Sequence, residues 1–272
     1  MEIGSFYVVA TPIGNLGDIT LRAIETLRSV DYIACEDTRV TRKLLDKYQI
    51  TVKLFDYQKF NEKECSEKII KLLEQGSSIA LVSDAGTPGI SDPGKVLFEE
   101  LRNKDINITP IPGSCAVSTF LSVLGREDET FVFLGFLPKS KIKQMELIGK
   151  YNHTNTIFYE SPNRLLETLT NIRDEFGSDK KIAVGRELTK VYEEVKVDSV
   201  SEILDYYSNN VLKGELVVML YSENKAVLDD SEFITEIKKL KKEGFSDKDI
   251  SKILSTLFDV NKNKIYKMSL SL

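Results

Sequence analysis

Two loops rich in glycine and proline hold the polar residues best placed for ligand chemistry. They span residues 11–18 and 83–94, and each follows a short apolar run that predicts a β-strand. In open α/β sheets, ligands bind beyond the carboxyl ends of the strands. Asp84, directly after the second run, would accept hydrogen bonds from an amino group or a ribose, or lie near a cation. The alternative is that Asp84 only accepts hydrogen bonds from the following amides of its own loop.

Neither loop fits a common phosphate-binding motif. The first loop keeps only Gly14 and Gly17 of a dinucleotide fingerprint, which argues against a nicotinamide cofactor. Residues 89–95 match the spacing of a phosphate loop, but Val96 stands where Ser or Thr would hold magnesium. Asp92 would repel phosphate, and Pro93 removes an amide donor. A positively charged cofactor without phosphates fits this composition better.

The pattern around these loops predicts an α/β protein. Ten short apolar or β-branched runs predict strands at residues 6–10, 32–35, 52–55, 79–83, 106–111, 131–135, 156–160, 182–186, 192–197 and 215–221. Helical spacing behind Thr20, Asp92-Pro93, Ser114 and Ser161-Pro162 predicts helices between them. The first five strands alternate with helices, which favours a mainly parallel sheet. The later strands are close together, which favours a mixed second sheet.

Prolines and a change of pattern divide the chain. Residues 110–113 (PIPG) interrupt the first α/β unit, and strand signals stop after residue 221. We therefore expect α/β domains at residues 1–111 and 112–223, and a helical segment at 224–272. The helical segment contains ten lysines and eight acidic residues, with lysines at 238, 239, 241 and 242. Those lysines form either a solvated helix face or a surface that contacts RNA.

Composition excludes several classes of protein. With 272 residues and 42% hydrophobic residues, the chain can bury a large core, and its net charge of −5 argues against coating nucleic acid through bulk charge. The three cysteines are far apart and His153 is the only histidine, so we expect no disulfide framework and no metal site. Without a signal-peptide pattern or a long apolar run, the sequence predicts a cytoplasmic protein that does not enter the membrane.

Seven motifs together resemble the small-subunit ribosomal RNA methyltransferase group of the tetrapyrrole methylase family. The resemblance runs from about residue 5 to residue 221. The motifs are residues 10–20 (ATPIGNLGDIT), 35–39 (CEDTR), 81–94 (LVSDAGTPGISDPG), 112–116 (PGSCA), 158–164 (FYESPNR), 185–190 (GRELTK) and 213–215 (KGE). The resemblance implies a two-domain tetrapyrrole methylase fold that binds S-adenosylmethionine between its domains, and a homodimer. It also implies methyl transfer to the ribose 2′-oxygen of a cytidine in small-subunit (16S) ribosomal RNA, either as free RNA or in the assembled 30S subunit.

Carried over residue by residue, the resemblance implies a set of cofactor contacts from both domains. They are Pro12, Ile13, Asp84, Ala85, Gly89, Ile90, Ser114, Cys115, Ala116, Phe158, Leu188 and Gly214. The turn at 114–116 also opens a predicted helix, whose free amides would suit the cofactor carboxylate.

A ribose hydroxyl is a weak nucleophile, so a base or a cation near it would help. The candidate catalytic residues are Asp37, Arg39, Glu160 (with Arg164), Arg186, Glu187 and Lys190. Each could equally form an ion pair between the domains, and the base stays unassigned. Tyr57 and Phe60 could stack a nucleobase or pack within the protein. Two other functions stay open: a methylase acting on a tetrapyrrole or a protein side chain, and a non-catalytic ribosome-assembly factor.

Overall fold

The computed structural model describes residues 3–126, 129–210, 212–222, 230–258 and 260–272. The chain forms two compact units, Met1–Tyr221 and Ser222–Leu272. The first unit contains two separate sheets, and the expected boundary after residue 111 falls between them. The expected boundary at residues 223–224 lies outside the described residues. The division into three domains therefore stays a prediction.

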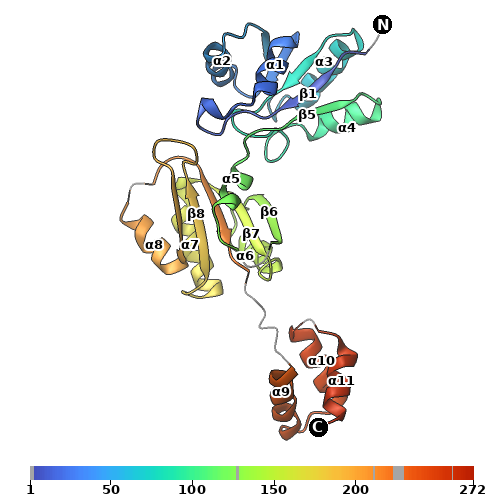
Figure 1. Cartoon of the computed structure of the whole chain (residues 1–272), viewed down its shortest axis with the longest axis vertical. Helices are drawn as coiled ribbons and strands as arrows, with labels where there is room; N and C mark the ends of the chain where they lie inside the picture. Colours follow the sequence, from blue (N-terminus) through green and yellow to red (C-terminus); the bar gives the residue numbers. More distant parts are fainter. Residues whose placement is uncertain (1–2, 127–128, 211, 223–229, 259) are drawn as a thin grey trace. The chain divides into compact units, whose positions relative to one another are not determined.

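The first sheet is parallel, with the strand order β3-β2-β4-β1-β5. Its strands are β1 (Phe6–Val9), β2 (Tyr32–Cys35), β3 (Lys53–Asp56), β4 (Ile79–Leu81) and β5 (Ile108–Ile111). Two core clusters show which helices cover it: α1 (Leu21–Ser29) and α2 (Thr38–Lys47) pack on one face, and α3 (Glu62–Glu74) and α4 (Lys95–Asn103) on the other (Figure 1). A short 3₁₀ helix, η1 (Leu16–Asp18), lies in the loop after β1. Because β1 and β4 are neighbouring parallel strands, the loops that follow them leave the sheet at the same edge.

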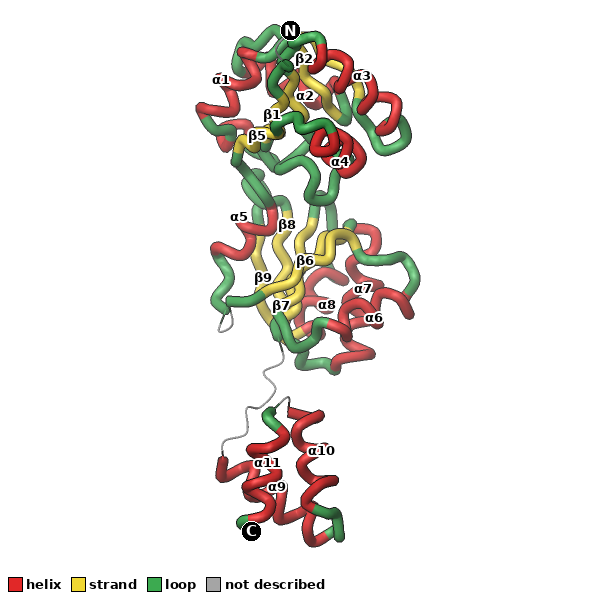
Figure 2. Tube along the Cα trace, turned by 90° about the vertical axis from the view of Figure 1, so that its right-hand side faces the viewer, coloured by secondary structure: helices red, strands yellow, loops and turns green. Residues whose placement is uncertain are grey.

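The second sheet is mixed, with the order β6-β7-β10-β8-β9. Its strands are β6 (Phe131–Phe136), β7 (Asn155–Glu160), β8 (Lys181–Arg186), β9 (Glu194–Ser199) and β10 (Leu216–Leu220), and only β6 and β7 are parallel. Figure 2 shows α6 (Lys141–Lys150), α7 (Pro162–Phe176) and α8 (Val200–Ser208) on one face and α5 (Ala116–Ser122) on the other. Each face has its own core cluster. The fold expected from the sequence is confirmed.

All ten predicted strands are present, and the local helix signals are mostly confirmed. Thr20 Oγ1 accepts a hydrogen bond from the Ala23 amide at 3.1 Å, and α7 begins at Pro162. The prediction that Asp92-Pro93 opens the helix before β5 is wrong, because that helix, α4, begins at Lys95 after Gly94. Glu62 Oε1 of α3 accepts hydrogen bonds from the Gly94 and Val96 amides at 2.9 and 3.1 Å, so a distant carboxylate serves as the cap.

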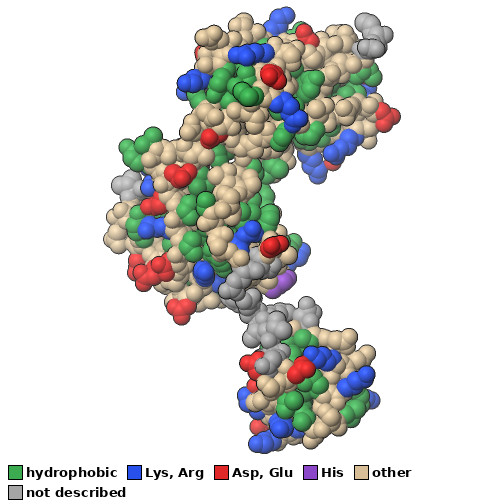
Figure 3. All heavy atoms as spheres, in the orientation of Figure 1, with side chains coloured by type: hydrophobic (Ala, Val, Ile, Leu, Met, Phe, Trp, Pro, Cys, Tyr) green, Lys and Arg blue, Asp and Glu red, His purple; other side chains and the backbone are tan. Residues whose placement is uncertain are grey.

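The second unit is helical, as expected, and its helices in the described residues are α9 (Asp230–Lys242), α10 (Asp247–Phe258) and α11 (Lys262–Leu270). They enclose their own small core of Phe233, Ile237, Ile250, Leu254 and Ile265. Figure 3 shows basic side chains on the surface of this unit. Among the helices of the described residues, none is long and apolar enough to cross a membrane.

Candidate functional site

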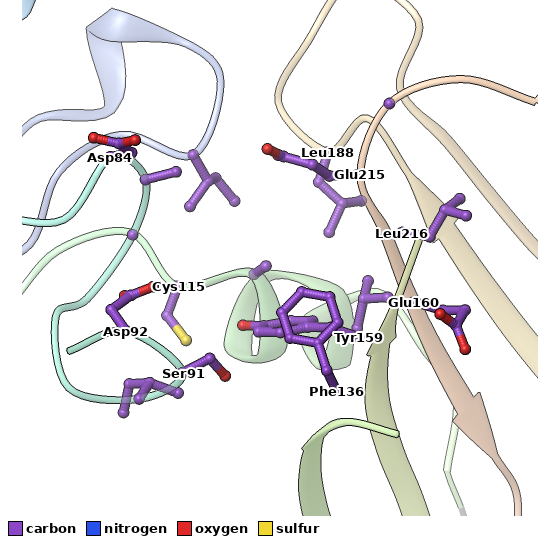
Figure 4. Close-up of a pocket in the computed structure, with 18 of the residues that line it drawn as sticks. Asp84, Ser91, Asp92, Cys115, Phe136, Tyr159, Glu160, Leu188, Glu215 and Leu216 are labelled. Atoms are coloured by element: carbon purple, nitrogen blue, oxygen red, sulfur yellow. The ribbon is translucent and has the colours of Figure 1, made fainter. Parts of the chain in front are cut away.

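A cavity of about 400 Å³ lies in the first unit and is lined by residues from both of its sheets. The first sheet contributes Glu36 after β2 and the Asp84–Thr87 stretch after β4. The second sheet contributes Phe136, Tyr159 and the Gly214–Val217 stretch, and Figure 4 shows Phe136, Tyr159, Glu215 and Leu216 around the cavity. The volume of the cavity lies in the range of small-molecule sites. The cavity also lies beyond the carboxyl ends of parallel strands, which is the usual position for ligands.

The cavity gathers most of the cofactor contacts expected from the sequence. The lining residues include Ile13, Asp84, Ala85, Ile90, Cys115, Ala116, Leu188 and Gly214. Four others do not line it: Pro12, Gly89, Ser114 and Phe158. Pro12 and Gly89 lie in the two loops beside lining residues, and the Ser114 carbonyl accepts a hydrogen bond from Thr87 Oγ1 at 3.1 Å.

Phe158 and Tyr159 project to opposite faces of β7. Phe158 is fully buried with Leu165 and Leu169 in the core under α7. Tyr159 packs on the other face and lines the cavity. Successive side chains of a strand alternate between faces, so of these two aromatic residues only Tyr159 lines the cavity.

Backbone contacts hold the two glycine-rich loops together. Thr11 and Gly86 form an antiparallel bridge, with N–H···O distances of 2.8 and 3.1 Å, and Thr11 Oγ1 donates to the Ser83 carbonyl at 3.1 Å. Asp84 Oδ1 accepts a hydrogen bond from the Asp37 amide at 3.0 Å. Among the described residues, the Asp84 carboxylate accepts no hydrogen bond from the following amides of its own loop, and it joins the segments after β4 and β2 instead.

Three carboxylates of the first sheet face the cavity, and each has a raised pKa. Burial, reinforced by Asp92, raises the pKa of Glu36 to about 6. Partial burial also raises the pKa values of Asp84 and Asp92. No lysine or arginine is among the described residues that line the cavity. These carboxylates can stabilise a cation and accept hydrogen bonds, and they would repel a polyphosphate.

Among the six candidate catalytic residues, only Glu160 lines the cavity. Asp37 caps α2, and its carboxylate binds the Arg39 guanidinium at 2.7 and 3.0 Å, which holds the pKa of Asp37 down to about 2. The Arg39 side chain is otherwise exposed. Glu160 is buried, accepts a hydrogen bond from Thr168 Oγ1 at 2.8 Å and lies 3.5 Å from Arg164 Nη2.

The other three candidates also form ion pairs close to their own positions. Lys190 Nζ lies 2.8 Å from Glu187 Oε1 and 3.2 Å from Glu215 Oε2, and Glu215 lines the cavity. Arg186 lies on the α8 face of the second sheet, 3.5 Å from Glu194, whose carboxylate accepts hydrogen bonds from two tyrosines of α8. These pairs join residues of the second sheet and its loops, so the alternative of an ion pair between the domains does not apply to them.

The structure also adds site residues that the sequence did not single out. Glu36, Phe136, Tyr159 and Glu215 line the cavity, and so does Asp92, which the sequence marked only as unfavourable to phosphate. Tyr57 is fully buried and cannot stack on a ligand, whereas Phe60 is 84% exposed and does not line the cavity. Among the described residues, no group of three or more His, Cys, Asp or Glu could hold a metal ion.

Comparisons with known proteins find a matching family and similar sequences. Residues 5–204 match the family of tetrapyrrole (corrin/porphyrin) methylases. Proteins named ribosomal RNA small subunit methyltransferase I are similar over most of the chain. The Synechocystis protein is 38% identical over 99% of both chains, and the Bacillus subtilis protein is 43% identical over 85% of this chain and 80% of its own. The Mycoplasmopsis pulmonis protein is 43% identical over 80% of this chain and 98% of its own.

Solved structures show the same fold at low sequence identity. A cobalt precorrin-4 methyltransferase superimposes with a TM-score of 0.61 at 14% identity, over 79% of this chain and 94% of its own. A diphthine synthase gives 0.62 at 15% identity, over 84% of this chain and 92% of its own. These likenesses concern the architecture alone.

Proposed function

The chain belongs to the tetrapyrrole methylase family, and from this premise we propose that it methylates the ribose 2′-oxygen of a cytidine in small-subunit ribosomal RNA. The methyl donor is S-adenosylmethionine, as in this family. The names of relatives with 38–44% identity support ribosomal RNA as the acceptor. The choice of the 2′-oxygen and of cytidine rests on the sequence motifs. We also propose that the protein works as a homodimer in the cytoplasm.

The observation that carries the proposal is the chemistry of the cavity. S-adenosylmethionine bears a sulfonium and an ammonium and no phosphate. This charge suits a cavity with five carboxylates, three of them from the first sheet, and no lysine or arginine among its described lining residues. Asp84 would bind a polar group of the donor, and Ile13, Ala85 and Leu188 would contact its apolar parts. When bound, the donor supplies an electrophilic methyl group. The protein must then position the acceptor and accept one proton.

Glu36 is the group best suited to accept that proton. It lines the cavity, and its pKa of about 6 leaves it ionised and moderately basic at neutral pH. Asp37, the neighbouring candidate from the sequence, is a weak base because Arg39 lowers its pKa. We therefore assign proton acceptance from the ribose hydroxyl to Glu36 in this proposal.

The second unit is an addition to the methylase fold that we propose contacts RNA. An alignment of 220 residues covers nearly all of the Mycoplasmopsis pulmonis relative, so that protein is shorter than this chain by about the length of the second unit. This relative, which carries the same methyltransferase name, therefore lacks about 50 residues that this chain has. We propose that the second unit of this chain raises acceptor affinity and takes no part in methyl transfer.

A comparison of cells with and without this protein tests the function. Mass spectrometry of nucleosides and mapped fragments from small-subunit RNA would locate any modification that depends on the protein. We expect one cytidine to lose a 14-Da ribose methylation when the protein is absent. An unchanged ribosomal RNA, together with tight binding of S-adenosylmethionine, would instead favour another methyl acceptor. An unchanged RNA and no donor binding would favour an assembly factor without activity.

A further inference from the structure

The edge strand β6 carries a bulge that changes the direction of Phe136. Phe133 pairs with Ile157 and Phe136 pairs with Tyr159, so three steps along β6 match two steps along β7. Gly135, within the bulge, has φ = +65°, a conformation that favours glycine. In a regular ladder, residue 135 would pair with Tyr159. The bulge therefore places a phenylalanine where a glycine would have been.

Phe136 lies at the cavity with its ring largely exposed. It lines the cavity and is 61% exposed, and its ring centroid is 5.5 Å from that of Tyr159 at an interplanar angle of 58° (Figure 4). Tyr159 in turn packs edge-on against Phe133, at 5.0 Å. An aromatic row thus leads from the core of the sheet to an exposed ring at the cavity, and that ring offers area for a further flat group.

Partly buried polar contacts fix the chain directly after Phe136. The Arg164 guanidinium donates to the Leu137 carbonyl at 3.2 Å and to the Pro138 carbonyl at 2.9 Å. Glu160, whose side chain is fully buried, lies beside Arg164 and accepts a hydrogen bond from Thr168. Because charge-assisted contacts hold both carbonyls, the position of Phe136 is set before any ligand binds.

We propose that Phe136 is the platform on which the nucleobase of the target nucleotide stacks. This inference rests on the proposed function and adds the residue that recognises the acceptor. A ribose hydroxyl can reach the donor only when its nucleotide leaves the stacked RNA, and an unstacked base is commonly received by an aromatic side chain. Among the aromatic side chains that line the cavity, Phe136 is exposed whereas Tyr159 is half-buried.

The chain contains no tryptophan, so a single substitution creates a unique fluorescent probe. The test uses the full-length Phe136→Trp variant, loaded first with S-adenosylhomocysteine and then titrated with cytidine 5′-monophosphate. We expect a small change on loading and a saturable quenching by the nucleotide. Ribose 5-phosphate, which lacks a base, should not quench. The matched control is Phe131→Trp, on the same strand, 45% exposed and outside the cavity lining.

Two results would overturn the inference. One is full quenching by S-adenosylhomocysteine alone, which would make Phe136 part of the donor site. The other is nucleotide quenching no greater than in Phe131→Trp. Calorimetry of S-adenosylhomocysteine on the unaltered protein separates this failure from a failure of the proposed function, since a missing donor site would abolish that binding in the parent chain.

Kinetics with small ribosomal subunits give a second, independent readout. Losing a stacked base should raise the acceptor KM of Phe136→Ala by about tenfold or more, while kcat at saturating acceptor and the donor affinity change little. Phe136→Tyr keeps a flat ring and should restore the KM. An unchanged KM in Phe136→Ala, with a melting temperature equal to that of the parent, would contradict the stacking role.

Discussion

The Asp37 amide donates a hydrogen bond to Asp84 Oδ1 at 3.0 Å, so the residues that follow β2 and β4 are joined at the edge of the cavity. Asp84 Oδ2 accepts no hydrogen bond from any residue that the structure describes. One oxygen of Asp84 is therefore used to orient the carboxylate, and the other is available to a ligand. The same side chain connects the architecture of the sheet with the proposed donor site.

Two substitutions at Asp84 should distinguish the effect of its charge on donor binding from the effect of its hydrogen bond with the Asp37 amide. In Asp84→Asn the side-chain oxygen can still accept from the Asp37 amide, so only the charge is lost. We expect calorimetry to show S-adenosylmethionine binding weakened by about tenfold, and weakened further in Asp84→Ala. Asp174→Asn, a surface carboxylate outside the cavity, is the control. Equal donor affinity in all three variants would remove Asp84 from the site.

Donor binding should depend on pH through Glu36. The folded protein holds a proton on Glu36 below about pH 6, and a cationic donor favours the ionised carboxylate. Affinity should therefore rise from pH 5 to pH 7 and then level off, with protons released on binding at the lower pH. Glu36→Gln should flatten this rise. A parent protein whose donor affinity is constant over the same range would argue against Glu36 as a cavity carboxylate.

The same group should affect folding stability. The pKa of Glu36 is raised from 4.5 to about 6, so between these values the folded state holds more protons than the unfolded state. The stabilising contribution is complete below pH 4.5 and is lost as pH rises through 6. Chemical unfolding of the ligand-free protein at several pH values should show this fall in the parent and a weaker one in Glu36→Gln. Identical pH profiles would contradict the raised pKa.

An added side chain at Gly14 should displace Lys190, because the loop after β1 meets the loop after β8 there. A Cβ at Gly14 would lie 2.8 Å from Lys190 Cε and still closer to Lys190 Cγ, beside the 3.1 Å hydrogen bond from the Asn15 amide to Thr189 Oγ1. Because Lys190 would lose its ion pairs with Glu187 and Glu215, we expect Gly14→Ala to lower the free energy of unfolding by about 1 kcal/mol and to weaken donor binding. Gly149→Ala, on open helix surface, should cost nothing. A neutral Gly14→Ala in both assays would disprove the close contact.

The lysines at the end of α9 should divide into two functional groups. Lys241 Nζ donates to the Ser269 carbonyl at 2.7 Å and lies 3.1 Å from Asp247, so it joins the three helices. Lys239 forms an ion pair with Glu236 of its own helix. Lys238 and Lys242 have no ion-pair partner among the described residues. Reversing these two charges should weaken RNA affinity and its salt dependence, with unchanged donor affinity.

The matched variant for that experiment is Lys241→Glu. It should lower the stability of the second unit, because it removes both contacts and places two carboxylates together. The two variants therefore separate RNA contact from helix packing. If Lys238 and Lys242 can both be reversed with the salt slope unaltered, the second unit does not hold RNA through this helix end.

Much of the fold could be predicted because it depends on local patterns. Apolar and β-branched runs marked every strand, and Thr20 and Ser161-Pro162 marked two helix starts. The start of α4 could not be predicted, since Glu62 supplies its cap from 32 residues before Gly94. The helix α2 was missed because charged residues dominate it and only Thr41, Leu44 and Leu45 are buried.

The site was predicted less completely, because a motif does not show which face its residues occupy. The motif around β7 indicated Phe158, but the alternation of the strand turns Tyr159 to the cavity. Likewise, the residues after β2 indicated Asp37, whereas Glu36 lines the cavity. Phe136 depends on a bulge, which no local signal except Gly135 announces.

The central claim is methyl transfer to a cytidine 2′-oxygen, and a reconstituted reaction tests it most directly. The purified full-length protein is incubated with methyl-labelled S-adenosylmethionine and small ribosomal subunits from cells that lack the protein, and the labelled RNA is digested to nucleosides for mass spectrometry. The account predicts label in one nucleoside, 2′-O-methylcytidine, and none with Glu36→Gln and Asp84→Ala combined. Label on a base, on another ribose or on a ribosomal protein would contradict it, and so would donor binding without any transfer.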